Sequence, residues 1–323
     1  MSIDCPVCQT EVNPTPLASY TSAQSAAHFC PETRSPERYS RLKDCIEKLW
    51  QGKESVVLQC PACEFAFGYP FVGGDEEFYT ILHEQQDYPS WRWDYGVAMT
   101  EIFEPLGGGS VLEIGAGSGA LLKVLNDQWK KFAVEGSELT RQPLEQLGIE
   151  VFRDLDLAIS NYPKSFDVIV MAQVLEHISD FQPLLSQCHQ LLKPGGKLFI
   201  GVPLGEAMIR QEQLTGCADM VPNHINKWTP KSLSIALTQA GLQPSAPIFQ
   251  PASLKNLKAS LHLKIIFDAT RPNSLAAQIY RIPQRRLRAP LLACLGLPAF
   301  LKMLPYAKKL TLGGAFAMVG IAP

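Results

Sequence analysis

The stretch from Val111 to Leu122, with the sequence VLEIGAGSGALL, limits the possible folds of this chain more than any other. A run of strand-forming apolar residues leads into glycines at alternate positions, and an apolar helical pattern follows. Gly115, Gly117 and Gly119 permit backbone conformations that a Cβ atom forbids, and they let a ligand approach the main chain closely. We therefore predict a strand, a tight ligand-binding loop and the start of a helix whose free N–H groups face the loop.

The spacing of this loop indicates which kind of nucleotide-like ligand it holds. A loop that binds the pyrophosphate of a dinucleotide reads GxGxxG, whereas this one reads ExGxGxG, with Glu113 at the end of the strand. A carboxylate there suits a cationic ligand better than a pyrophosphate. The pattern resembles motif I of the class I S-adenosylmethionine (SAM)-dependent methyltransferases. The resemblance implies that SAM lies along Glu113, Gly115, Gly117 and Gly119.

Short β-rich runs alternate with helical segments from about residue 97 to residue 242, which predicts a mostly parallel sheet covered on both faces. The expected strands are Val111–Ile114, Phe132–Glu135, Glu150–Arg153, Asp167–Met171, Lys197–Val202 and Ala315–Ala322. With the resemblance, they predict an α/β, Rossmann-like fold with a seven-stranded sheet. Its methyltransferase core spans residues 97–254, and residues 313–323 complete it.

Two segments after the loop are expected to hold the rest of the cofactor. Glu135 lies twenty residues beyond Gly115, where an acid at a strand end reaches the ribose of a ligand on the loop. The alternative for Glu135 is a solvated acid that caps a helix near Ser137. The resemblance places Asp154 against the exocyclic amine of adenine and Leu155 against its ring, although an ordinary loop acid is equally compatible with the pattern.

The segment FDVIVMAQVLEHISD is typical of a strand buried on both faces that runs into Gln173, Glu176 and His177. In the family, the corresponding segment lines the junction of cofactor and substrate, which implies that Gln173 lies near the methionine end of SAM. The turn LKPGGKL also resembles a family element, so an NAD dehydrogenase is disfavoured. The motif of enzymes that methylate amines of nucleic-acid bases, [DNS]PP[YFW], is absent from this segment.

Two histidines are candidates for the general base. His224 lies in the segment PNHINKW, in the loop after the fifth strand, where related enzymes often have a histidine on the methyl-acceptor side. An imidazole with a pKa near neutrality can take the proton of the acceptor during methyl transfer. His224 is therefore the first choice as catalytic residue and His177 the second; the alternative for His177 is that it orients the cofactor loop.

The first 75 residues carry two CxxC pairs, which are Cys5, Cys8, Cys60 and Cys63. Two such knuckles supply the four thiolates that tetrahedral zinc prefers, which predicts a small zinc-ribbon-like domain with a structural Zn²⁺ ion. The long interval between the pairs leaves His28, Cys30 or Cys45 as substitute ligands. A redox role needs a thioredoxin-like setting that is missing here. The arrangement is similar to bacterial methyltransferases of surface-glycan or secondary-metabolite pathways.

Aromatic residues crowd the segment 76–96, which we interpret as a linker. Tyr88, Trp91 and Trp93 either pack the small domain onto the core or form a lid over the substrate.

A basic segment is expected to form helices inserted between residues 255 and 312. Eleven Lys or Arg residues between Lys255 and Lys309 accompany the single acid Asp268, although the whole chain has a net charge of −2. Basic, apolar-rich helices favour an anionic membrane surface or a phosphate-bearing substrate. The alternative is a solvated basic face above a packing stripe.

The chain shows no secretory signal pattern, and its longest apolar run is broken by prolines, which predicts a cytoplasmic protein that could lie at the inner membrane surface. The predicted function is SAM-dependent transfer of a methyl group to a small-molecule, sugar, glycan or lipid-linked acceptor. The alternative is an RNA methyltransferase or nucleic-acid-binding protein that uses the zinc ribbon and the basic insertion. A third hypothesis is a protein that binds SAM without transferring its methyl group.

Overall fold

The computed structural model describes residues 3–84, 91–136, 138–215, 219–251, 258, 261–262, 264–265, 268–269, 271, 273–303 and 312–323. The strands are β1 (Ile3–Asp4), β2 (Glu11–Val12), β3 (Ala18–Thr21), β4 (Glu54–Gln59), β5 (Ala66–Tyr69), β6 (Gly109–Ile114), β7 (Trp129–Val134), β8 (Glu150–Phe152), β9 (Phe166–Ala172), β10 (Leu192–Pro203), β11 (Asn226–Lys227), β12 (Gln243–Pro244), β13 (Ile248–Pro251) and β14 (Leu312–Ile321).

The α-helices are α1 (Ser22–Phe29), α2 (Pro36–Trp50), α3 (Glu76–His83), α4 (Trp93–Ala98), α5 (Glu104–Leu106), α6 (Glu138–Glu145), α7 (Leu155–Asn161), α8 (Phe181–Leu191), α9 (Gly205–Thr215), α10 (Pro230–Gln239), α12 (Leu275–Tyr280) and α13 (Arg285–Met303). A π-helical turn, η1 (Met99–Phe103), and two 3₁₀ turns, η2 (Leu122–Val124) and η3 (Leu175–His177), complete the assignment.

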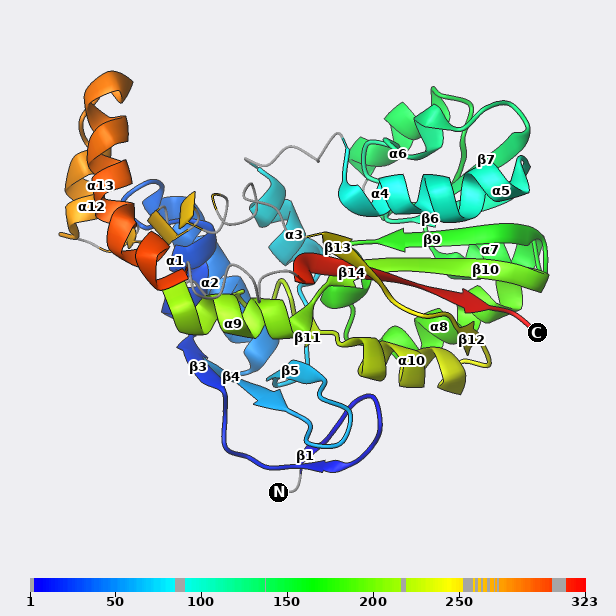
Figure 1. The fold of residues 1–323 in the computed structure, drawn as a ribbon, viewed down its shortest axis with the longest axis horizontal. Coiled ribbons are helices and arrows are strands. Elements are labelled where there is room, and N and C mark those ends of the chain that lie inside the picture. Colours follow the sequence, from blue (N-terminus) through cyan, green and yellow to red (C-terminus); the bar gives the residue numbers. More distant parts are fainter. Residues whose placement is uncertain are drawn as a thin grey trace.

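The central sheet has the order β12-β14-β10-β9-β6-β7-β8, with β13 also paired to β14. Strands β10, β9, β6, β7 and β8 are parallel, and β14 runs antiparallel to β10. Helices α4 and α5 lie on one side of this sheet, and α8 and α10 lie on the other (Figure 1). This confirms the expected Rossmann-like α/β fold with a mostly parallel sheet.

Among the described residues the sheet has eight strands, not the predicted seven. The short strands β12 and β13 both pair with β14, at Ile321 and at Ala317 respectively. The two short segments thus pair with the outer edge of the long final strand. The sequence pattern does not reveal them, because each is too short to show the alternation of apolar and polar residues that marks a strand. Strand β14 itself pairs along most of β10, as the final-strand prediction requires (Figure 1).

The predicted helix after the glycine loop is wrong. The chain forms turns and the 3₁₀ turn η2 there, and then enters β7 at Trp129. Few residues separate Gly119 from Trp129, and the chain must also return to the start of the parallel strand β7. A helix of several turns does not fit into that connection, so the loop cannot use a helix N-terminus to hold a ligand.

The residues at its two ends explain where helix α10 begins and ends. The Thr229 side chain accepts a hydrogen bond from the Ser232 amide, Pro230 occupies the first turn, and Gly241 follows the helix with a φ of +81°.

The N-terminal region forms two small sheets, which lie below the core in Figure 1. One of these sheets includes a strand from a later part of the chain. Strands β1 and β2 pair with each other, whereas β3, β4 and β5 form a second sheet that β11 completes. The pairing joins Asn226 to Phe67 and Lys227 to Ala66. The segment that follows His224 is therefore built into the N-terminal sheet.

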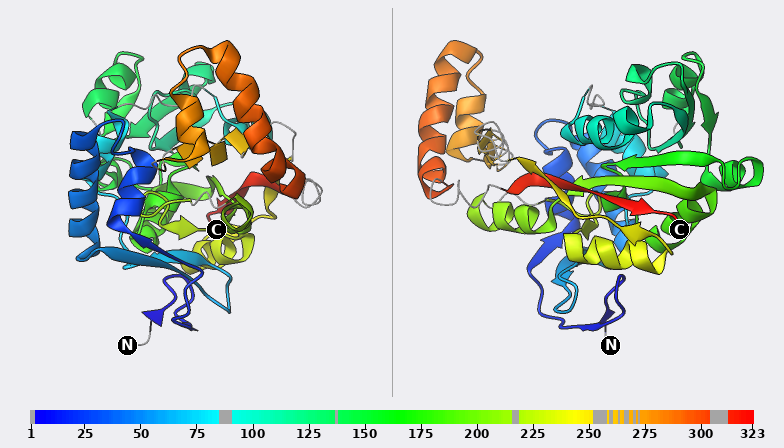
Figure 2. Two further views of the ribbon diagram at one scale, coloured as in Figure 1. Left: turned by 90° about the vertical axis from the view of Figure 1, so that its left-hand side faces the viewer. Right: turned by 45° about the vertical axis from the view of Figure 1, so that its right-hand side comes forward.

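Helices α12 and α13 stand at the far end from the central sheet and project from the body in Figure 1 and in the right-hand view of Figure 2. Within the part of the chain that is described, no helix combines the length and the apolar character needed to cross a membrane.

Candidate functional site

The glycine loop lies where the chain direction across the sheet reverses. From β6 the chain proceeds to β7 and β8 on one side, and then returns to β9 and β10 on the other side. Open α/β sheets bind ligands at such a switch point, outside the carboxyl ends of the strands. The predicted cofactor loop therefore occupies the expected edge of the sheet.

The loop accepts only glycine at two of its positions. Gly115, Gly117 and Gly119 have φ values of +72°, +52° and +69°, which lie in the left-handed region. A Cβ atom on Gly115 would lie 2.7 Å from Cγ2 of Val174, and one on Gly119 would lie 2.6 Å from Cδ2 of Leu144. The loop thus packs on the segment that follows β9, three residues before His177.

Glu135 faces the glycine loop. Its amide donates to the carbonyl oxygen of Phe152 at 3.0 Å, which continues the pairing of β7 with β8. Its carboxylate oxygen Oε2 accepts a hydrogen bond from the Gly117 amide at 2.9 Å. The side chain is therefore held beside the loop, and its contact with a ribose stays a prediction. Ser137, at the start of the alternative helix cap, lies outside the described residues.

Glu113 is buried behind the loop, with 1% of its surface exposed. Neither of its carboxyl oxygens makes a hydrogen bond of normal geometry to a described residue. Burial raises the pKa of Glu113 to about 8, against the opposing effects of the Tyr95 hydroxyl and the Arg92 guanidinium. A cation bound nearby would favour the ionised carboxylate.

Arg92 and Asp94 belong to this end of the site, although the sequence pattern did not single them out. Arg92 Nη2 donates to the Tyr95 hydroxyl at 2.9 Å, and Gln173 Nε2 donates to Asp94 Oδ2 at 3.2 Å. Gln173 has a φ of +57°, and its amide donates to the carbonyl of Gly201. In the sequence WRWD, these two charged residues alternate with two tryptophans. This alternation is the sequence signal that could have identified them.

Asp154 has a local structural role. Its Oδ1 atom accepts a hydrogen bond from the Leu157 amide at 3.1 Å and caps α7. Leu155 is buried in the first turn of that helix. The contacts of these two residues with adenine stay a prediction.

The second part of the site is a cluster of Glu176, His177 and His224. One potential ligand atom from each residue lies within 4.8 Å of those of the other two. The rings of His177 and His224 meet edge to face with centroids 4.8 Å apart. The structure therefore brings both predicted catalytic histidines together, beside the end of β9.

A buried amide holds the two histidine segments together. Asn226 Nδ2 donates to the carbonyl oxygens of Leu175 at 2.9 Å and Ile178 at 2.7 Å. The indole N–H of Trp228 also donates to Leu175, at 3.3 Å. These bonds attach the loop of His224 to η3, which carries His177.

Asp219 is a site residue that the sequence analysis missed, because one acid in a loop has no distinguishing pattern. Its Oδ1 atom lies 2.7 Å from Nδ1 of His224. Burial lowers the pKa of His224, but the charge of Asp219 outweighs this effect and raises it above its usual value. The pKa of Asp219 is held well below its usual range, mainly because His224 and Lys227 outweigh its burial.

Glu176 is the most deeply buried member of the cluster. Its carboxyl group is fully buried, and among the described residues neither oxygen finds a hydrogen-bond donor. Burial raises its pKa to about 7, although the attraction of His224 opposes the shift. Sequence reasoning noted this residue only as part of the EH pair.

The four predicted cysteine ligands lie together. The sulfur atoms of Cys5 and Cys63 are 3.5 Å apart, as are those of Cys8 and Cys60, and all four lie within 4.8 Å of one another. Ligand sulfurs at about 2.3 Å from a tetrahedral zinc ion would be about 3.8 Å apart, so the spacing fits such an ion. Cys30 and Cys45 lie elsewhere, and Cys45 contacts Asp75.

Two of the aromatic residues can be placed. Trp91 is 48% exposed and contacts the ring of Tyr95, whereas Trp93 begins α4 and packs against the core. Tyr88 lies outside the described residues.

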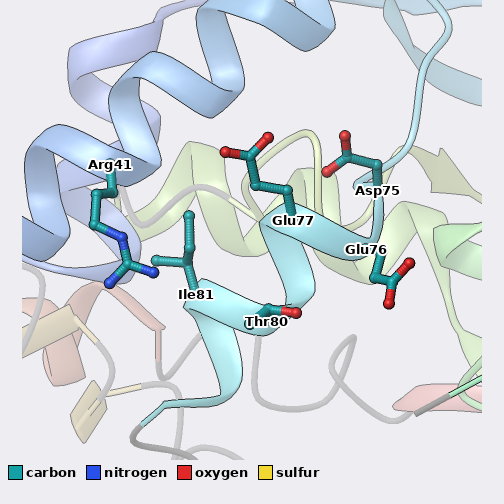
Figure 3. A pocket seen from close by; sticks show the side chains of 6 residues that line it. All are labelled: Arg41, Asp75, Glu76, Glu77, Thr80 and Ile81. Atoms are coloured by element: carbon teal, nitrogen blue, oxygen red, sulfur yellow. The ribbon is translucent and has the colours of Figure 1, made fainter. Parts of the chain in front are cut away.

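An acidic depression of about 490 Å³ lies on α3 (Figure 3). It is lined by Arg41, Asp75, Glu76, Glu77, Thr80 and Ile81. Asp75 caps α3 through the Phe78 amide, and the acids stand in the first turn, where they complement the helix dipole.

Parts of the chain are similar to known proteins. Residues 95–245 match the family model described as a methyltransferase domain. Among curated proteins, the chain is similar to the ubiquinone biosynthesis O-methyltransferase of Idiomarina loihiensis, with 29% identity over 38% of this chain and 52% of the relative. It is also similar to the ubiquinone biosynthesis O-methyltransferase of Xylella fastidiosa, with 33% identity over 30% of this chain and 42% of the relative. The chain spans about half the length of the curated relatives it matches. A solved SAM-dependent methyltransferase from Archaeoglobus fulgidus has 15% identity and a TM-score of 0.45, over 76% of this chain and 99% of that one.

The raised pKa of Glu113 predicts a specific dependence of stability on pH. Folding raises this pKa from an ordinary 4.5 to about 8, so the folded chain binds more protons than the unfolded chain between these values. The contribution of Glu113 to the unfolding free energy must therefore fall as the pH rises through this interval.

Glu113→Gln removes this effect. We expect the unfolding free energy of the variant, relative to wild type, to increase steadily from pH 4.5 to pH 8 in urea titrations. Glu101→Gln, at an exposed position, is the control for the loss of a carboxylate that is not buried. A pH-independent difference for Glu113→Gln would show that Glu113 is ionised in the folded chain throughout.

Proposed function

We propose that this chain is a SAM-dependent methyltransferase that acts on a small-molecule acceptor. The observation that carries the proposal is the hydrogen bond between Glu135 Oε2 and the Gly117 amide, which fixes an acid beside a loop of left-handed glycines at the switch point. The match of residues 95–245 to a methyltransferase domain supports it.

The residues around the loop fit SAM. A Cβ atom at Gly115 or Gly119 would collide with Val174 or Leu144, so packing requires glycine at both positions and the loop keeps its bare backbone. Glu135 would hold the ribose hydroxyls, and buried Glu113 would favour a positive charge at the loop. SAM bound there would supply a methyl group on a positively charged, reactive sulfur. Much of the rate would come from the chain positioning acceptor and donor in line.

The acceptor belongs beside the histidine cluster. Asp219 Oδ1 lies 2.7 Å from Nδ1 of His224 without the geometry of a hydrogen bond, and Nε2 is the nitrogen that would take the acceptor's proton. His177 is the second candidate for this role. Because the curated relatives are O-methyltransferases of ubiquinone biosynthesis, we favour a hydroxyl oxygen on a small molecule. A sugar, glycan or lipid-linked hydroxyl fits the same chemistry.

A structural Zn²⁺ ion at Cys5, Cys8, Cys60 and Cys63 is also part of the proposal, and the sulfur spacing supports it. The Thr229 hydroxyl donates to the carbonyl oxygen of Cys63 at 3.3 Å, so the cysteine cluster and the cap of α10 stabilise each other.

Gly117→Arg tests the cofactor site. The bulky side chain at a φ of +52° should displace the Glu135 contact and fill the loop. We expect loss of SAM binding in isothermal titration, with circular dichroism and zinc content unchanged. Leu157→Arg, at an exposed position on α7, is the matched control and should bind SAM normally. Retained affinity in Gly117→Arg would mean that the cofactor binds elsewhere.

His224→Ala tests the acceptor side. We expect the formation of S-adenosylhomocysteine, measured over a panel of phenols and sugars, to slow by about 10²–10⁴-fold, because proton removal is impaired. SAM affinity should not change. His189→Ala removes a histidine of α8 outside the cluster and should retain wild-type turnover. Unchanged turnover in His224→Ala would exclude this residue as the base.

We also propose that the basic segment contacts an anionic membrane surface. Helix α13 exposes Leu287, Leu291, Leu297 and Leu301, which recur at helical spacing, and residues 273–303 contain five Lys or Arg residues and no Asp or Glu. A peripheral position at the inner membrane surface would follow.

Leu291→Asp should weaken sedimentation with vesicles that contain anionic lipid, because it places a negative charge in this apolar stripe. Leu157→Asp is the matched control, since Leu157 is 49% exposed and Leu291 is 45% exposed. Equal binding of wild type to neutral and anionic vesicles, or no binding to either, would contradict the proposal.

A further inference from the structure

Lys227 lies in the interior of the protein, with 1% of its surface exposed. The ammonium group of a lysine loses its hydration there, so a buried lysine is stable only where acceptors or negative charges replace the water. A methionine of similar length would fill the same space without this cost. The ammonium group must therefore be stabilised by what it binds.

The main chain at Lys227 is held on two sides. In β11, Lys227 lies opposite Ala66 of β5. The carbonyl group of Trp228 accepts a hydrogen bond from the Gly205 amide at 2.7 Å, and a Cβ atom on Gly205 would lie 2.6 Å from the carbonyl oxygen of Lys227. The side chain of Lys227 therefore starts from a fixed point between the N-terminal sheet and the start of α9.

The ammonium group of Lys227 binds the main chain at Asp219. Its Nζ atom donates a hydrogen bond to the carbonyl oxygen of Asp219 at 2.9 Å. The side chain of the same aspartate reaches His224, with Oδ1 at 2.7 Å from Nδ1 of the imidazole. The amide of His224 donates to the carbonyl oxygen of Met220 at 3.3 Å. Lys227 thus fixes the backbone from which the Asp219 carboxylate reaches the imidazole.

We infer that Lys227 is a positioning residue, which holds the main chain of Asp219 so that the Asp219 carboxylate faces Nδ1 of His224. Its role in methyl transfer rests on the proposed function, in which Nε2 of His224 takes the acceptor's proton. Lys227 acts through Asp219 and is not itself a catalytic residue.

The two charged residues act on His224 in opposite directions. Burial and the charge of Lys227 lower the pKa of His224, whereas Asp219 raises it above its usual value. Loss of the Lys227 charge alone must therefore raise this pKa, whereas loss of the hold on Asp219 must lower it. The sign of the change in a Lys227 variant shows which of the two effects dominates.

Other titratable groups surround these residues. Those around the imidazole are Glu176 and His177 on η3 and His28 on α1. On α9, Glu212 interacts with the ammonium group. Each of these groups is present in every variant described below, so the variants differ only in the residues that the inference concerns.

The test is an NMR titration of His224 in the full chain, with the imidazole C–H signals identified by their loss in His224→Ala. Lys227→Met and Lys227→Leu both remove the ammonium group and its hydrogen bond, and circular dichroism shows whether each variant is folded. We expect the pKa of His224 to fall, because the Asp219 carboxylate no longer stays opposite Nδ1. A pKa equal to or above that of wild type in either folded variant would overturn the inference.

A double-mutant cycle tests whether Lys227 acts through Asp219. Asp219→Asn should also lower the pKa of His224, because it removes the negative charge. In the Asp219→Asn background, Lys227→Met should lower this pKa no further, since the carboxylate that it positions is gone. An equal fall in both backgrounds would contradict the inference. Lys231→Met, which removes a lysine that is 53% exposed on α10, is the matched control and should leave the pKa unchanged.

Turnover supplies a second readout. A base must be unprotonated to act, so activity rises with pH through the pKa of His224, and a lower pKa moves this rise to lower pH. We expect this shift in Lys227→Met, with kcat reduced about tenfold, a part of the ~10²–10⁴-fold that a general base contributes. The KM for SAM should not change. A raised KM for SAM with an unchanged kcat and pH profile would show that Lys227 does not position the base.

Two results separate this inference from the proposed function. If the pKa of His224 falls in Lys227→Met while the wild type does not bind SAM, the positioning role stands and the methyltransferase proposal is wrong. If the pKa does not fall while His224→Ala still slows methyl transfer, the positioning role is wrong and the methyltransferase proposal stands.

Discussion

The geometry of the cluster of Glu176, His177 and His224 depends on the buried amide of Asn226. Its hydrogen bonds to the carbonyl groups of Leu175 and Ile178 span η3, the turn that carries Glu176 and His177. Asn226 itself lies two residues after His224. One side chain therefore brings two segments that are distant in the sequence into contact, and it does so without using any of the chemically active groups.

The same short segment joins the N-terminal region to the core. Strand β11, which begins at Asn226, pairs with β5, and Trp228 packs against Phe65 and Phe181 with ring centroids 4.7 Å and 5.0 Å away. The cysteine cluster lies in the same apolar core. The N-terminal region is therefore a structural support for the His224 loop, and changes in its folding should be transmitted to the histidine cluster.

Two buried glutamates stand at the two ends of the site. Glu113 lies behind the glycine loop and Glu176 lies beneath the histidines, and each lacks a hydrogen-bond partner of normal geometry among the described residues. Burial raises the pKa of both. A carboxylate in surroundings of low dielectric constant attracts a nearby cation strongly. Both ends of the site therefore favour positively charged groups.

The sequence by itself determined the local elements: the strands of the parallel sheet, the left-handed glycines, the start of α10 at Thr229 and the two cysteine pairs. These depend on side-chain periodicity and backbone preference over a few residues. Tertiary structure alone decided that His177 meets His224, that Asp219 joins them, that β11 completes the N-terminal sheet and that a 3₁₀ turn replaces the expected helix after Gly119. Those features follow from long-range pairing and from the space between strands, which no local pattern encodes.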